Sequence, residues 1–361
     1  MHVPDGFINA PVSAVTGVVA AGAIAVSLRG ARRELGGTSR SNEAESGGEK
    51  TAPLAGLVAA FIFAVQMLNF PVAAGTSGHL LGGALAAILV GPFTGVLCVS
   101  VVLLMQGILF ADGGLTALGV NITDMAIVTT VVAYAVFRGL VKVLPRKRRS
   151  ITVAAFVSAL LSVPAAAAVF TLIYALGGTT DVPITKVATA MIGVHVLIGI
   201  GEATITALTV GAVIAVRPDL VYGARGLRQR LKLRVGGELV DAPAPALPVA
   251  ARASRRKVWA VGLVTSLVLA GFVSFYASSS PDGLVKVAKD QGIDKNTKKH
   301  HTGDSPLAGY GVKNISDARL SGGLAGVIGV GVTAVAGSGI FWAVRRRRTA
   351  DASPASLPEG V

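Results

Sequence analysis

Charged residues are scarce in this 361-residue chain. They make up 14% of the sequence, whereas soluble domains carry about 25%, and hydrophobic residues make up 52%. The hydrophobic residues form long runs, which are typical of helices that cross a lipid bilayer. The sequence therefore predicts an all-α polytopic membrane protein.

Cysteine and the common catalytic motifs are also missing or nearly so. The single cysteine, Cys98, lies inside a hydrophobic run, which excludes a disulfide within the chain and a thiolate cluster. A metal site must then use nitrogen or oxygen ligands. The chain has no GxxxxGK[ST], HExxH, GxSxG or CxxC pattern. We therefore do not expect an enzyme, and in particular not an ATPase.

Nine hydrophobic segments predict about nine spans: 10–28, 53–69, 78–91, 93–110, 118–139, 151–176, 186–216, 257–278 and 321–344. The third is shorter than the roughly 20 residues that cross a bilayer, so we expect a broken or partly re-entrant helix there. Residues 1–235 then form a bundle of about seven helices. Residues 236–256 are a Pro/Ala-rich cytoplasmic linker, and residues 257–361 form a two-helix hairpin with an outer loop at 279–320.

The formal net charge of +14 follows from where Lys and Arg lie. Of the 33 basic residues, 25 fall in the segments 29–52, 138–149, 217–257 and 345–348. With nine spans these segments share one side, which the positive-inside rule makes cytoplasmic. We expect the N-terminus outside and the C-terminus in the cytoplasm, and the charge then gives no reason to expect a nucleic-acid partner.

Three of the five histidines lie in the second half of the sequence. His300 and His301 lie in the outer loop, which we expect to be a solvated polar loop, with a transient metal relay as the alternative. His195 lies inside a span, and Glu202 follows seven residues later, about two turns along the same helix face. Because ionisable groups in a bilayer usually pair or serve function, we expect a structural pair or a coupling role.

The N-terminal stretch MHVPDG can form a metal chelate. The Met1 α-amine and the His2 amide nitrogen close a five-membered ring on an ion, and that amide nitrogen and His2 Nδ1 close a six-membered ring. His79, expected on the same outer side, would complete a plane of four nitrogens. Such a plane suits Ni(II) and Cu(II) and can accept Co(II), whereas Zn(II) prefers a tetrahedron. The chelate needs an unextended N-terminus, which agrees with the lack of a basic signal-peptide region.

Four stretches resemble one family in order along the chain: MHVPDGFINAPV at 1–12, LNFPVAAGTSGHLLGGALAAILVGP at 68–92, QGILFADGGLTALGVNITDMA at 106–126 and GVHVLIGIGEATITALTV at 193–210. They are similar to the substrate-binding membrane component (CbiM/NikM type) of energy-coupling-factor cobalt/nickel ABC transporters. The resemblance implies that Met1, His2 and His79 hold Co²⁺ or Ni²⁺ as transported substrate, with no catalytic cofactor.

The same resemblance implies which residues pack around the site and in which membrane the protein works. Ser77, Asn121 and Asp124 would lie behind the ligands, although the family pattern has Asn where Asp124 stands. The protein would work in the plasma membrane of a bacterium or archaeon. It would act with a membrane coupling (T-type) protein and cytoplasmic ATPase subunits, which would supply the ATPase that this chain lacks.

The C-terminal part carries a second resemblance. Residues 278–293, SSSPDGLVKVAKDQGI, are similar to the small two-span partner (CbiN/NikN type) with its PDGLE motif. Val285 replaces the glutamate of that motif. The chain therefore resembles a fusion of the two membrane components.

Two other functions stay open. The nitrogen site could belong to a membrane metalloenzyme, although a closed plane of four nitrogens leaves no equatorial position for a substrate. It could also belong to a membrane metal sensor, although the cytoplasmic segments are short and basic and offer no output domain. The sequence does not decide between cobalt and nickel as the bound ion.

Overall fold

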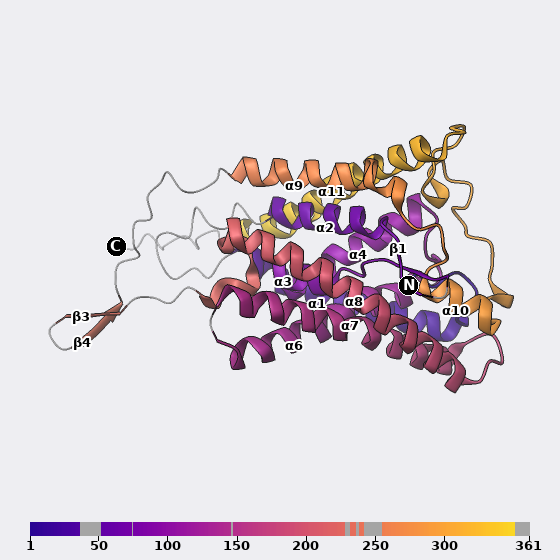
Figure 1. Ribbon diagram of the computed structural model, residues 1–361, viewed down its shortest axis with the longest axis horizontal. Helices are drawn as coiled ribbons and strands as arrows, with labels where there is room; N and C mark the ends of the chain where they lie inside the picture. Colours follow the sequence, from indigo (N-terminus) through magenta and orange to yellow (C-terminus); the bar gives the residue numbers. More distant parts are fainter. Residues whose placement is uncertain are drawn as a thin grey trace, which may run out of the picture.

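A computed structural model of the chain describes residues 1–36, 52–73, 75–145, 147–227, 232–235, 238–241 and 255–350. Long helices run side by side along the longest axis of the molecule (Figure 1). The N-terminus and the short helix α10 (Gly283–Gln291) lie at one end of this axis. Helix α8 (Ile184–Val216) ends, and α9 (Arg255–Gly271) begins, at the opposite end, where the basic segment 217–257 is attached.

Seven helical segments in the described part of the chain are long and apolar enough to cross a membrane. They are contributed by α1 (Ala10–Gly36), α4 (Pro92–Leu109), the continuous run of α5 (Leu118–Asn121), a π-helical stretch (Ile122–Val128) and α6 (Thr129–Val143), α7 (Arg148–Gly177), α8, residues 257–276 with α9, and α11 (Ala318–Ala350). The other two predicted spans are shorter helices, α2 (Ala52–Gln66) and α3 (Gly83–Val90). The prediction of an all-α multi-pass membrane protein is confirmed.

The short predicted span at 78–91 is indeed broken. Residues Ser77–Gly78 form strand β2, which pairs antiparallel with β1 (Phe70–Pro71). The chain then continues without regular structure to Gly82, whose φ of 90° favours glycine, and α3 begins only after it. All eight residues of α3 are buried. His79 therefore lies in an irregular segment ahead of the helix, enclosed by the bundle.

The turn into α3 lies inside the protein, where backbone N–H groups need acceptors other than water. Glu202 of α8 provides acceptors for two of these groups: its oxygens accept hydrogen bonds from the N–H groups of Leu81 (2.5 Å) and Gly82 (3.0 Å). His195 Nδ1 instead lies 2.7 Å from the Met191 carbonyl oxygen, one turn back in its own helix. Among the described residues Glu202 and His195 do not form the expected pair: the Glu202 oxygens accept from backbone N–H groups, and His195 Nε2 has no hydrogen-bond partner.

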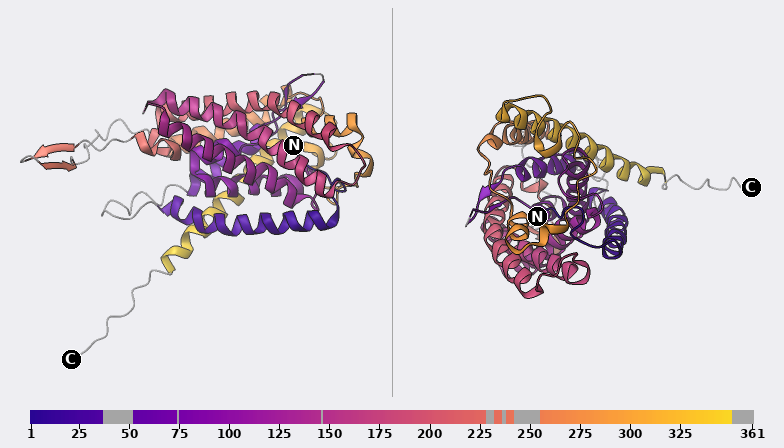
Figure 2. Two further views of the ribbon diagram at one scale, coloured as in Figure 1. Left: turned by 90° about the horizontal axis from the view of Figure 1, so that it is seen from below. Right: turned by 90° about the vertical axis from the view of Figure 1, so that its right-hand side faces the viewer.

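The C-terminal helices pack along one side of the bundle (Figure 2). Helices α9 and α11 contact each other, and both contact α2. A Cβ atom on Gly56 of α2 would lie 2.7 Å from the backbone nitrogen of Ser338 in α11, so the two helices meet at a glycine. Close approach at small residues is how helices gain packing energy in lipid.

The boundaries predicted at 235/236 and 256/257 stay predictions. Of the predicted linker, 236–237 and 242–254 lie outside the described residues. The rest belongs to strand β4 (Glu238–Asp241), which pairs with β3 (Lys232–Val235), and to the start of α9. Short 3-10 turns complete the structure at Pro218–Leu220, Tyr222–Leu227, Val273–Tyr276, Ile293–Asn296 and Ala308–Tyr310.

We expect Glu202→Ala to lower the free energy of unfolding by about 2–4 kcal/mol, because it leaves two buried N–H groups without an acceptor. Glu202→Gln keeps one acceptor oxygen and should cost about half as much. Thermal unfolding of the purified protein in detergent measures both. Thr204→Ala, at an exposed position of the same helix, is the matched control. A Glu202→Ala protein as stable as this control would show that the carboxylate does not hold the turn.

Candidate metal centre

The first residues of the chain enter the protein. Met1 and Val3 are almost fully buried. The side chain of Asn121 holds the Val3 backbone on both sides: the Val3 N–H donates to Oδ1 (2.7 Å), and Nδ2 donates to the Val3 carbonyl (3.2 Å). Farther along, Asp5 Oδ1 accepts hydrogen bonds from the N–H and the hydroxyl of Thr116. Asn121, predicted to lie behind the ligands, thus fixes the backbone that carries Met1 and His2.

The three predicted ligand residues come together at this end of the molecule. The Met1 amine nitrogen lies 2.6 Å from His79 Nε2, and the rings of His2 and His79 stack with their centroids 5.2 Å apart. His79 Nδ1 lies 3.0 Å from the Leu80 carbonyl oxygen. Because a carbonyl can only accept, Nδ1 carries the proton and Nε2 presents its lone pair toward the amine.

The His2 ring faces two other side chains in this arrangement. Nδ1 lies 3.4 Å from Asp112 Oδ1, and Nε2 lies 3.1 Å from Gln106 Oε1. Burial lowers the pKa of the His2 imidazole from 6.5 to about 4. The ring is therefore neutral at pH 7, which is the form that binds a metal ion.

Asp282 joins this cluster from the C-terminal part of the chain. Its Oδ2 lies 3.0 Å from the Met1 amine nitrogen and 3.6 Å from His79 Nε2. One ligand atom each from His2, His79 and Asp282 lie within 4.8 Å of one another. Burial opposes ionisation of the carboxyl group, but the positive charge of the Met1 ammonium outweighs it and holds the pKa of Asp282 well below its usual range. Asp282 was not among the predicted site residues, although it stands in the PDGLV stretch.

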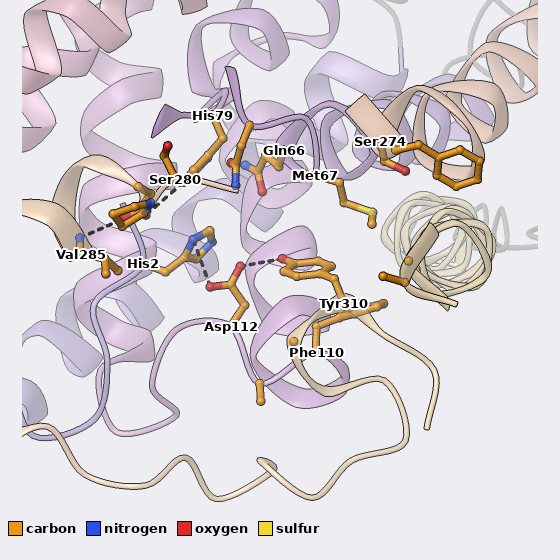
Figure 3. Close-up of a pocket in the computed structure, with 18 of the residues that line it drawn as sticks. His2, Gln66, Met67, His79, Phe110, Asp112, Ser274, Ser280, Val285 and Tyr310 are labelled. Carbon is orange, nitrogen blue, oxygen red and sulfur yellow. Dashed lines mark hydrogen bonds and ion pairs between the residues drawn. The ribbon is translucent and has the colours of Figure 1, made fainter. Parts of the chain in front are cut away.

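A cavity of about 580 Å³ adjoins the cluster. Within it, Asp112 lies between His2 and Tyr310 (Figure 3), and its Oδ2 accepts a hydrogen bond of 2.6 Å from the Tyr310 hydroxyl. Burial and the Asp112 charge raise the pKa of Tyr310 well above its ordinary value, so the phenol stays protonated and donates. Val285 also lines the cavity, at the position where the motif of the resembling family has glutamate.

Ser77, also predicted to lie behind the ligands, connects the two parts of the chain. Its N–H donates to the Pro281 carbonyl (2.9 Å), and its hydroxyl donates to the Ser280 carbonyl (2.7 Å). Because His79 follows two residues later, Ser77 holds the segment before Asp282 against the segment that carries a predicted ligand. This arrangement brings a residue of the C-terminal part to the site.

Asp124 and His195 form no hydrogen bond with a predicted ligand among the described residues. Both Asp124 carboxylate oxygens are buried without a hydrogen-bond partner in the described part of the chain, inside the π-helical stretch. His195 Nε2 is likewise buried and unpartnered there, and a Cβ atom on Gly283 would lie 3.3 Å from His195 Cε1. His195 thus lies against the start of α10, one residue from Asp282.

The two outer-loop histidines differ. His300 Nε2 lies 3.0 Å from the Gly113 carbonyl oxygen, and His300 Nδ1 accepts a hydrogen bond from the Thr302 N–H. His301 is exposed. The expectation of a solvated loop is therefore wrong for His300, because its ring contacts the backbone of the loop next to Asp112. The exposure of His301 agrees with that expectation.

Comparison with known proteins supplies a family. The model of the family described as "CbiM: Cobalt uptake substrate-specific transmembrane region" matches residues 2–220, and that of the PDGLE domain matches residues 256–346. A putative fused nickel transport protein NikMN of Archaeoglobus fulgidus is 38% identical over 222 residues, which are 61% of this chain and 68% of that protein. A putative metal transport protein of Haloquadratum walsbyi is 37% identical over 222 residues, 62% of this chain and 94% of that protein.

The name of a third relative also describes a fused protein. The fused nickel transport protein NikMN of Rhodobacter capsulatus is 41% identical over 137 residues, which are 38% of this chain and 36% of that protein. The CbiM match covers more than half of this chain, and the PDGLE match begins close to α9. The chain therefore belongs to the CbiM family of cobalt uptake substrate-specific transmembrane regions, here joined in one chain to a PDGLE domain.

Proposed function

We propose that this protein is the substrate-binding component of an ATP-driven transporter that imports Co²⁺ or Ni²⁺. The observation that carries the proposal is the buried Met1 amine, 2.6 Å from His79 Nε2 and next to the His2 ring. Those groups are the ones that a planar nitrogen chelate requires, and a plane of nitrogens suits nickel and can accept cobalt. The names of the relatives, which are nickel, cobalt or metal transport proteins, agree with this cargo.

Loading of the ion would rearrange the His2 ring. The chelate uses His2 Nδ1, the atom that now faces Asp112 Oδ1 at 3.4 Å. The ion would replace this contact and would also take the lone pair that His79 Nε2 now directs at the amine. The amine would bind as a neutral group and the His2 amide nitrogen as an anion, so each of them gives up one proton when the metal enters. The adjoining cavity offers room for the incoming hydrated ion.

Energy for transport would come from other subunits. The chain has no ATP-binding motif, so we propose that a membrane coupling protein and cytoplasmic ATPase subunits act with it. The site lies at the end of the long axis opposite to the attachment of the basic segment 217–257. By the positive-inside rule the site would then face outward and the basic end would face the cytoplasm.

We expect His79→Ala and His2→Ala each to weaken Ni²⁺ binding by at least about 100-fold, more than the loss of a group behind the ligands. Titration of the purified protein with Ni²⁺ and with Co²⁺ measures the affinity. His301→Ala removes an exposed histidine of the outer loop and is the matched control. If His301→Ala abolishes binding and His79→Ala does not, the proposed site is wrong.

A Gly-Ser extension before Met1 should abolish tight binding, because it turns the amine into an amide and displaces a buried residue. The same dipeptide added after Val361 is the control. Metal bound per chain after gel filtration is the measurement. Equal binding by both proteins would show that the α-amine is not a ligand.

Uptake of radioactive nickel or cobalt into proteoliposomes tests the energy source. Proteoliposomes with this chain alone should take up no more ion in the presence of ATP than in its absence. Adding a coupling protein and ATPase subunits of the same transporter should make uptake ATP-dependent, and His79→Ala should remove that uptake. ATP-dependent uptake by this chain alone would contradict the proposed division of labour.

A further inference from the structure

The C-terminal part of the chain contributes a charged residue to the centre. Asp282 stands more than 200 residues from His79 in the sequence, yet its Oδ2 lies 3.6 Å from His79 Nε2 and 3.0 Å from the Met1 amine nitrogen. We propose that Asp282 Oδ2 is an oxygen ligand of the transported ion, outside the plane of nitrogens. The inference rests on the proposed function and adds a ligand to the same site.

The two oxygens of Asp282 have separate tasks. Oδ1 accepts a hydrogen bond of 2.7 Å from the Val285 N–H and thereby caps the N-terminus of α10. Oδ2 is turned toward the Met1 amine and His79. The cap fixes the orientation of the carboxylate, so Oδ2 can bind an ion without giving up the bond that anchors the side chain.

The backbone on either side of Asp282 is also fixed relative to His79. The Ser77 hydroxyl and N–H donate to the Ser280 and Pro281 carbonyls, and the Ser278 N–H donates to the Asn69 carbonyl at 2.7 Å. These contacts join the segment before Asp282 to both strands of the β1–β2 hairpin region that leads to His79. A carboxylate held by its own helix and by the ligand-bearing segment is positioned before the ion arrives.

The distances fit one ion shared by three atoms. The Met1 nitrogen, His79 Nε2 and Asp282 Oδ2 are separated by 2.6, 3.0 and 3.6 Å. Two neighbouring ligands at right angles, each about 2.0–2.1 Å from an ion, lie about 2.9 Å apart. Three atoms with these separations leave a point about 2 Å from each of them. The Met1 amine, which now lies between His79 and Asp282, would lose a proton and turn its lone pair to the ion.

Charge supplies the reason for a carboxylate. A divalent cation in a buried site needs negative charge nearby, since an uncompensated buried charge is costly. The nitrogen plane consists of an amine, two imidazoles and the His2 amide nitrogen, which binds only after losing its proton and so supplies one negative charge. Asp282 brings a full negative charge to the atoms that would bind the ion. The resulting set of four nitrogens and one oxygen is tetragonal, which suits Ni(II) and Cu(II).

The test uses the full chain loaded with Ni²⁺ and reads the number of ligands by X-ray absorption at the nickel K-edge. A square-planar Ni²⁺ site shows a sharp pre-edge peak, which a fifth ligand suppresses. We expect the wild-type protein to lack this peak. Asp282→Asn should show it and should bind Ni²⁺ at least about tenfold more weakly. Asparagine is as good a helix cap as aspartate, so α10 keeps its N-terminus.

Asp317→Asn is the matched control, because Asp317 caps α11 through the Leu320 N–H and is exposed. It should leave both the affinity and the edge unchanged. The wild-type edge alone decides the question if Asp282→Asn does not fold: a sharp square-planar peak in the wild type overturns the proposal. Weaker binding by Asp282→Asn with an unchanged edge also overturns it, since Asp282 would then only position the amine.

Failure of this inference differs from failure of the proposed function. If His79→Ala abolishes binding while Asp282→Asn matches the wild type in affinity and edge, the nitrogen site stands and the oxygen ligand is wrong. If His79→Ala and the N-terminal extension both leave binding intact, the site itself is wrong, and the inference is overturned with it.

Discussion

A free α-amine held beside an imidazole inside the protein is the contact on which the rest of this structure depends. A buried ammonium is costly unless it is paired and hydrogen-bonded. Here the Met1 amine has His79 Nε2 on one side and Asp282 Oδ2 on the other. Since both partners come from distant parts of the chain, one terminal nitrogen fixes how the N-terminus, the α3 segment and the C-terminal part meet.

Bringing the N-terminus to that position constrains the neighbouring loops. Gly113 has a φ of 78°, and a Cβ atom there would lie 2.8 Å from Asn121 Nδ2 and 3.3 Å from His2 Cβ. Only glycine combines that backbone conformation with so little space. On the other side, Glu202 binds the N–H groups of Leu81 and Gly82, which places the segment with His79 at a fixed depth. Helix α3 is short because the residues just before it, up to Gly82, form the irregular segment that presents His79.

The sequence was sufficient for the features that depend on composition and local chemistry. Hydrophobic runs give the helices, and a histidine at position 2 with a second outer-side histidine gives the cluster of Met1, His2 and His79. Asp282 could not be found in that way, because its role depends on docking of a distant segment through Ser77. The position of Asp124 could not be read from the sequence either. It follows Asn121 by three residues, but the helix switches to π-helical winding at Ile122, which alters the faces that later residues occupy.

The fusion of the two parts has a physical consequence at the end of α4. The last carbonyls of a helix lack partners within it, and at this end of α4 residues of the C-terminal part supply them. The hydroxyls of Thr302 and Ser305 donate to the carbonyls of Gly107 and Leu109, respectively.

The Gly309 N–H donates to the Phe110 carbonyl, next to Tyr310 and its bond to Asp112. Each bond is worth only about 0.5–1.5 kcal/mol net. Hydrogen bonds of this strength would by themselves hold a separate loop only weakly. A tethered one docks at an effective concentration in the millimolar range, so a few bonds suffice to keep Asp282 at the site. Covalent linkage, together with the packing of α9 and α11 on α2, therefore keeps Asp282 beside the Met1 amine.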